Sequence, residues 1–366
     1  MIPAALYYTI YLYLIIVLTL LVAFKIRNSG YDRIRRGGNN FIWAQLLSVI
    51  LAIWIGMRPI SSRYFGDTGN YANSYYLMQG EVASPQHEGE WLWNSFMYLC
   101  AQSMDVSFFF TIVSIAYFCF MLFACKRLMP NNPWVALLFN LGAFSFFSYG
   151  TNGIRNGLAC SIVLFVIALA SGEKKEKILA TLLGLCAMLI HKSTALPLLS
   201  LIISIYFIKS FKWAYSFWIL SIIISLIAGG FVENIFTGLG FDDRLDSYIN
   251  GAEEYAARGY KSGFRWDFLL YSMMPIVLGY YVVIKRGIQD KTYLLLLNTY
   301  TLSNAFWVML IRASYSNRFA YLSWFMYPIV LAYPLLRLNI WGKNQGKWLS
   351  RIMLAHVGFT WVMSLI

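Results

Sequence analysis

Long apolar segments constrain this chain more than any other feature. Of its 366 residues, 59% are hydrophobic and 12% are charged, and the mean hydropathy is +0.60. Those values lie outside the range of water-soluble globular domains. Because about 20 apolar residues in a helix cross the roughly 30 Å of bilayer hydrocarbon, we predict an all-α polytopic membrane protein.

About twelve such segments can be read from the sequence, and we expect a transmembrane helix at each. The first lacks a basic leader and a small-residue cleavage pattern, so we expect a retained span and not a signal peptide. Without internal repeats or a soluble domain, the chain is predicted to form one integral membrane domain over residues 1–366. The segments are residues 4–24, 41–57, 107–125, 134–149, 155–171, 178–190, 193–208, 213–231, 266–284, 292–311, 319–336 and 351–366.

Charge predicts the orientation, because Lys and Arg accumulate on the cytoplasmic side. With the N-terminus outside, the inner loops hold most of the 29 Lys and Arg residues. Of the 16 acidic residues, they hold only Asp32, Glu173, Glu176 and Asp290. The net charge of +13 therefore reflects membrane topology, and we expect no nucleic-acid partner.

Two predicted outer loops are long, residues 58–106 and 231–265, and functional sites are often built on loops. The first ends in EWLWNSFMYLCAQ, which is too short to cross a membrane comfortably. We expect a re-entrant or interfacial helix there, with Trp91 and Trp93 at headgroup depth. Any chemistry should therefore face outward.

Basic residues that stay on the outer side are candidates for a ligand site. Arginine donates bidentately to phosphate oxygens, so an arginine-lined cavity suits a phosphate or diphosphate ligand. For each residue alone, snorkelling to lipid headgroups is an equally good explanation. The outer residues are Arg58, Arg63, Arg155, Lys192, Arg244, Arg258, Lys261, Arg265, Arg312 and Arg318.

Arg155 is the most informative of these. Gly153 and Gly157 are four residues apart, so on a helix they share one face and allow a neighbouring backbone to approach closely. Arg155 then points away from that face and must meet either a cavity or lipid.

Two further polar positions could take a proton from a hydroxyl. Asp67 begins D-T-G-N, which is typical of a turn or a helix N-cap, and could instead be a carboxylate held between Arg63 and Tyr71. His191 ends an apolar segment and is followed by Lys192. A histidine beside cations tends to stay neutral and so can act as a general base, although an interfacial structural role is the commoner one.

Other signals are weak. Glu88 and Glu90 with Tyr75, Tyr76 and the tryptophans could form a sugar-stacking wall, although membrane-belt aromatics explain the tryptophans equally well. Asp242 and Asp243 are best explained as exposed loop residues. The sequence contains no Walker, HExxH or GxSxG motif, and its five cysteines have no CxxC spacing, so we expect neither a metal nor a cofactor.

The order of the short motifs resembles the EpsG/Wzy-type family of oligosaccharide repeat-unit polymerases. An outer loop with R-x-x-x-x-R and DTGNY precedes a glutamate and an aromatic segment. GIRNGLA then opens a helix, IHKST ends the next one, and R-x-x-Y follows near the C-terminus. The resemblance covers Arg58 to Tyr321. Relatives often have Gln where this chain has Asn156, and either Glu88 or Glu90 matches the family glutamate.

The resemblance implies inverting glycosyl transfer at the outer face of a bacterial cytoplasmic (inner) membrane. A growing glycan on undecaprenyl diphosphate moves onto the sugar of an incoming lipid-linked repeat unit, as in O-antigen, capsule or exopolysaccharide synthesis. No nucleotide sugar, metal or cofactor is then required. The implied partners are the lipid-linked oligosaccharide, the bilayer and a chain-length regulator protein.

The resemblance also distributes roles among the candidate residues. Asp67 or His191 would act as the base, and Arg155 would be catalytic. The expected diphosphate ligands are Arg58, Arg63, Arg155, Lys192, Arg312 and Arg318, and the expected sugar contacts are Tyr71, Glu88, Glu90, Asn156 and Tyr315. An O-antigen ligase is the main alternative, since it uses the same donor with another acceptor. A flippase or transporter of lipid-linked sugars is a third hypothesis, although such transporters often have internal repeats.

Overall fold

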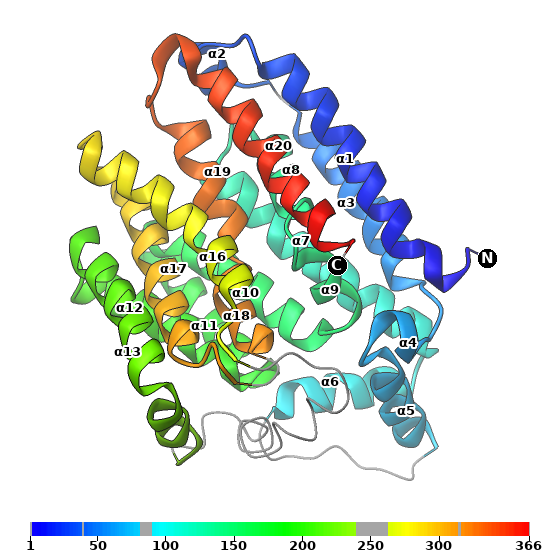
Figure 1. The fold of residues 1–366 in the computed structure, drawn as a ribbon. Helices are drawn as coiled ribbons and strands as arrows, with labels where there is room; N and C mark the ends of the chain where they lie inside the picture. The colour runs from blue at the N-terminus through cyan, green and yellow to red at the C-terminus, as the bar shows by residue number, and fades with distance from the viewer. Residues whose placement is uncertain (1, 39, 81–89, 239–262, 314–315, 366) are drawn as a thin grey trace. The chain divides into compact units, whose positions relative to one another are not determined.

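A computed structural model describes residues 2–38, 40–80, 90–238, 263–313 and 316–365, and within these residues every regular element is helical (Figure 1). The chain divides into two compact units, residues 1–194 with 332–366 and residues 195–331. The prediction of a single membrane domain stays a prediction.

The first unit holds most of the helices. They are α1 (Tyr7–Ile26), α2 (Tyr31–Arg36), α3 (Phe41–Gly56), α4 (Ser62–Phe65), α5 (Thr68–Gln79), α6 (Trp91–Ala101), α7 (Val106–Leu128), α8 (Pro133–Leu141), α9 (Phe146–Thr151), α10 (Ile154–Ala170), α11 (Lys174–Ile190) and α20 (Gln345–Met363), with short 3₁₀ turns η1 (Ala4–Leu6), η2 (Lys192–Thr194) and η4 (Gly342–Asn344). Helix α10 packs along α7 and α11, α3 packs along α7, and α1 packs along α20.

The second unit contains α12 (Ala195–Tyr206), α13 (Phe211–Gly238), α16 (Trp266–Gly279), a π-helical turn η3 (Tyr280–Lys285), α17 (Lys291–Met309) and α18 (Asn317–Trp324). Helix α19 (Tyr327–Arg337) runs from the second unit into the returning part of the first. Helix α17 packs against α13 and α12. The backbone of α13 is not helical at Ala228, so this helix is kinked there.

All twelve predicted segments are largely helical, which supports the polytopic all-α prediction. Five helical stretches in the described residues are long and apolar enough to cross a membrane: Ala4–Ile26, Val106–Leu128, Phe211–Phe231, Trp266–Lys285 and Asn317–Arg337. Three shorter apolar helices are Phe41–Gly56, Ile154–Ala170 and Lys192–Tyr206. Twelve crossings therefore remain a prediction. Helix α6 has 11 residues, which is about 16 Å and agrees with a helix that does not span.

The predicted span 134–149 is broken. Helix α8 ends at Leu141, and α9 starts only at Phe146. Carbonyl groups released at the break find partners, because the Tyr11 hydroxyl donates to the Leu141 oxygen (2.5 Å) and the Thr360 hydroxyl to the Gly142 oxygen (2.7 Å). Non-helical backbone at membrane depth is tolerated where other parts of the protein satisfy its polar groups. Helices α1 and α20 do this here, because each supplies a hydroxyl donor to a carbonyl at the break.

The break predicts a role for the Tyr11 hydroxyl. Tyr11→Phe leaves a buried carbonyl without this donor, so we expect a loss of about 1 to 3 kcal/mol in the free energy of unfolding. Reversible unfolding of the purified protein in detergent measures the loss. Tyr13→Phe is the matched control, since Tyr13 lies on the same helix but is 54% exposed. Equal stability of the two variants would contradict this account of the break.

Predicted inner loops contact one another at one end of the first unit. The Asn132 amide donates to the Ile34 oxygen (2.9 Å), and the Gly346 N–H donates to the Ser29 oxygen (2.8 Å). Helix α2 lies at this end, and α4, α5 and α6 lie at the opposite end (Figure 1). This grouping agrees with the predicted alternation of inner and outer loops.

Candidate functional site

Two of the sequence motifs are joined by hydrogen bonds at the predicted outer end of the first unit. The Asp67 N–H, in DTGNY, donates to Asn152 Oδ1 (2.8 Å), directly before GIRNGLA. Arg58 Nη2 donates to Thr68 Oγ1 (2.9 Å) and to the Thr151 oxygen (2.8 Å), and the Thr68 hydroxyl donates to the same carbonyl (2.7 Å). The first outer loop is therefore attached to the junction of α9 and α10.

Arg58 is an internal residue and not a surface cation. It is 2% exposed, its Nη1 donates to the Ile55 oxygen (3.1 Å), and its guanidinium lies over the Phe110 ring. Burial lowers the pKa of Arg58 to about 10, so the side chain is still protonated at neutral pH. These contacts favour a structural role for Arg58, in which it holds the loop, over the predicted contact with the diphosphate.

Glu90 connects the GIRNGLA motif to the IHKST motif. Its Oε2 lies 2.5 Å from Arg155 Nη1 in GIRNGLA, and its Oε1 is hydrogen-bonded to His191 Nδ1 in IHKST. The Lys192 N–H also donates to Glu90 Oε1 (3.2 Å). The side chains of Glu90, Arg155 and His191 are 13%, 20% and 15% exposed, so this cluster is largely shielded but remains accessible.

Each member of the cluster sits at the end of a helix. Glu90 is the N-cap residue of α6, Arg155 lies in the first turn of α10, and His191 ends α11 with an extended backbone. The Thr194 hydroxyl donates to the His191 oxygen (2.8 Å) and so fixes the turn that follows. Because α11 packs against both α10 and α6, the three helix ends meet.

The cluster keeps Glu90 ionised. Burial alone would raise the pKa of Glu90, but the His191 hydrogen bond, the Arg155 charge and the Lys192 N–H outweigh it and hold the pKa below its usual value. At neutral pH the carboxylate is therefore a pure acceptor.

The prediction that both glycines beside Arg155 allow close approach of a neighbouring backbone was confirmed for one of them and wrong for the other. A Cβ on Gly157 would lie 2.4 Å from the Tyr149 carbonyl oxygen, so this glycine does allow close approach. No described atom lies within 4 Å of a Cβ built on Gly153, so the prediction was wrong there. The reason is that Gly153 is the N-cap of α10, outside the helical spacing that the prediction assumed. Arg155 meets Glu90 rather than lipid.

The prediction for Trp93 also needs correction. Trp91 is 43% exposed, but Trp93 is 1% exposed and packs edge-on against the rings of Tyr71 and Phe109. Trp93 is therefore a core residue and does not face the surface as a membrane-belt tryptophan would; its depth in the membrane stays a prediction. The pattern of aromatic residues could not distinguish the two, because both positions belong to one short aromatic segment.

Several other candidates lie near this end of the first unit. Arg63 is exposed and stacks over Tyr64, and Asn156 Oδ1 accepts a hydrogen bond from Cys160 Sγ (3.0 Å). Asp67 occupies the N-cap position of α5, as its turn-like sequence predicted, and its Oδ1 accepts from the Asn70 amide (3.3 Å).

The remaining candidates belong to the second unit or lie outside the described residues. Arg312 is exposed, and its side chain passes so close to Gly229 that a Cβ there would lie 2.7 Å from Arg312 Cδ. Arg318 is partly buried in the first turn of α18. Glu88 and Tyr315 are outside the described residues, as are Arg244, Arg258, Lys261, Asp242 and Asp243.

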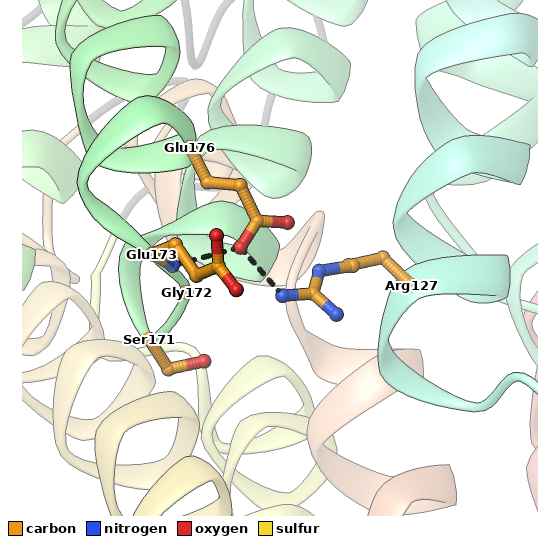
Figure 2. Close-up of a pocket in the computed structure, with 5 residues that line it drawn as sticks. All are labelled: Arg127, Ser171, Gly172, Glu173 and Glu176. Atoms are coloured by element: carbon orange, nitrogen blue, oxygen red, sulfur yellow. Dashed lines mark hydrogen bonds and ion pairs between the residues drawn. The ribbon is translucent and has the colours of Figure 1, made fainter.

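A surface depression lies at the predicted inner end, away from the cluster. Figure 2 shows its lining of Arg127, Ser171, Gly172, Glu173 and Glu176. Arg127 Nη2 pairs with Glu176 Oε2 (2.8 Å), which also accepts from the Glu173 N–H (2.9 Å) in the capping box of α11. These groups pair with one another, so we interpret the depression as the surface around the N-terminal cap of α11 and not as a ligand site. Over the described ranges, no three His, Cys, Asp or Glu side chains gather as a metal site would require.

Sequence reasoning missed the central place of Glu90 and the loop contacts of Thr68, Thr151 and Asn152. It left Glu88 and Glu90 equivalent and assigned both to sugar. Glutamate is not among the preferred N-cap residues, so the helix-start rules did not separate Glu90 from Glu88.

Three of the motifs thus meet through Asn152 and Glu90, and the EpsG family matches residues 41–365. The chain belongs to the EpsG family. No curated protein and no solved structure matches it. EpsG membership indicates a membrane protein of bacterial polysaccharide biosynthesis with a function of the polysaccharide-polymerase type.

Proposed function

We propose that this EpsG protein is a polysaccharide repeat-unit polymerase, an inverting glycosyltransferase active at the outer face of the cytoplasmic membrane. The observation that carries the proposal is the Glu90 carboxylate, which brings Arg155 and His191 into one partly exposed cluster. An arginine and a histidine there supply the two groups that transfer from a diphosphate requires: a fixed positive charge and a base.

The reaction proceeds by displacement at the anomeric carbon of the donor glycan. A hydroxyl of the incoming lipid-linked unit forms the new C–O bond while the bond to undecaprenyl diphosphate breaks, and that bonding pair leaves with the diphosphate. The hydroxyl proton passes to His191. Arg155 stabilises the charge that develops on the leaving group with its guanidinium, whose Nη1 pairs with Glu90.

The other candidates take supporting roles in this proposal. Arg63, Lys192, Arg312 and Arg318 attract the lipid diphosphate, and Tyr71 and Asn156 contact sugar. Asp67 is the alternative base, although its loop contacts with Asn152 and Asn70 favour a structural role. A chain-length regulator is an expected partner.

A defined lipid-linked repeat unit tests the proposal. We expect the purified protein, without nucleotide sugar or ATP, to convert this substrate into a ladder of longer products, separated by gel electrophoresis. Unchanged substrate beside an active control enzyme would refute polymerisation. Deletion in cells separates the alternatives, because loss of a polymerase leaves surface glycan of one repeat unit, whereas loss of a ligase leaves long chains on the carrier lipid.

A further inference from the structure

The hydrogen bond between Glu90 and His191 restricts where the imidazole proton can be. The ionised carboxylate can only accept, so the ring nitrogen facing it must donate. That nitrogen is Nδ1. In the neutral ring the proton is then on Nδ1, and Nε2 carries the free lone pair.

The second nitrogen is available for chemistry. The structure gives His191 Nε2 no hydrogen bond to any described residue, and the side chain is 15% exposed. The charged groups on the packed elements are Glu90 before α6, Arg155 on α10 and Lys192 on η2. Arg155 faces the other carboxylate oxygen, so it holds Glu90 in place without competing for Nδ1.

We infer that Glu90 is a positioning residue, which holds His191 in the Nδ1–H tautomer so that Nε2 can accept the proton of the attacking hydroxyl. This role rests on the proposed glycosyl transfer and goes beyond the sugar contact that the sequence indicated. Glu90 acts through His191 and Arg155 and does not itself touch the reacting atoms.

His356 provides an internal reference with the opposite tautomer. It is 3% exposed, and its Nε2 lies 2.8 Å from the Phe139 carbonyl oxygen. A carbonyl only accepts, so Nε2 of His356 must donate. The chain contains three histidines, and His87→Gln removes the third from the spectra.

Nitrogen-15 NMR of histidine-labelled protein in detergent, at a pH where the rings are neutral, tests the tautomer. We expect His191 to carry its proton on Nδ1 and His356 on Nε2. In Glu90→Ala, His191 should revert to a mixture dominated by Nε2–H. Glu176→Gln is the control, since it alters the other arginine–glutamate pair, and should leave the His191 signals unchanged. An Nε2–H form of His191 in the unmodified protein would overturn the inference, and so would a folded Glu90→Ala with unchanged signals.

Kinetics with the lipid-linked substrate separate positioning from substrate binding. Glu90→Gln should lower kcat about 100-fold or more with little change in KM, and Glu90→Asp should recover part of the rate. A raised KM with full kcat would show that Glu90 binds substrate instead. If the unmodified protein makes no polymer, the proposed function fails, and the role of Glu90 fails with it, while the spectra still report the tautomer.

Discussion

Arg155→Ala is expected to reduce polymer formation by at least about 100-fold, and Arg155→Lys should not restore it. Removing one preorganised donor to a developing negative charge costs about 10²- to 10³-fold in kcat. Lysine keeps the charge, but it lacks the planar fork that can bind Glu90 and a phosphate oxygen at the same time. The initial rate of repeat-unit addition, with protein folding checked by thermal unfolding, measures the effect.

Arg127→Ala is the matched control for Arg155→Ala. Arg127 also pairs with a glutamate, at 2.8 Å, but at the predicted inner end of the first unit and with 43% of its side chain exposed. An exposed pair contributes at most about 1 kcal/mol to stability, and we expect unchanged activity. Full activity of both Arg155 variants in folded protein would show that Arg155 is not part of the active site. The outer basic residues would then be better explained by contacts with lipid headgroups.

The sequence predicted the helical segments and the motifs that meet, because both depend on local patterns. Apolar length is set by bilayer thickness, so the segments could be found without knowing their neighbours. Short motifs such as GIRNGLA and IHKST stood out because polar residues are costly in apolar surroundings. Their order also pointed to the family that the chain belongs to.

Features that depend on tertiary contacts could not be predicted. At the break after α8, Tyr11 and Thr360 reach the free carbonyls from helices far away in the sequence. The burial of Arg58 likewise depends on Thr68 and Thr151, which nothing in the sequence connects to it. For the same reason the sequence could not distinguish an arginine that binds phosphate from one that, like Arg58, makes its contacts with neighbouring loop residues.

The buried Arg58 side chain fixes the two parts of the chain that carry Asp67 and Arg155. Arg58 attaches the first outer loop to Thr151, and α10 begins three residues after Thr151. The loop that carries Asp67 and the helix that carries Arg155 are thus fixed to the same short junction. A substitution that moves this junction should impair activity even without touching a charged residue.

Gly157→Ala is such a substitution. Its Cβ would lie 2.4 Å from the Tyr149 carbonyl oxygen, which is backbone and cannot move aside like a flexible side chain. Overpacking of this kind costs about 1 to 3 kcal/mol in the free energy of unfolding. Because α10 must then shift away from α9, Arg155 moves relative to Glu90, and we expect about 10-fold or greater loss of polymer formation as well as a lower midpoint of thermal unfolding.

Gly153→Ala isolates the steric cause, since both glycines flank Arg155 at the same distance in sequence. No described atom lies within 4 Å of its Cβ position, and its φ of −88° suits alanine. Only the weaker N-cap preference of alanine acts there, so we expect a loss of about 1 kcal/mol or less and nearly full activity. If Gly153→Ala impaired the enzyme as much as Gly157→Ala, the close approach of α9 and α10 would not be what positions Arg155.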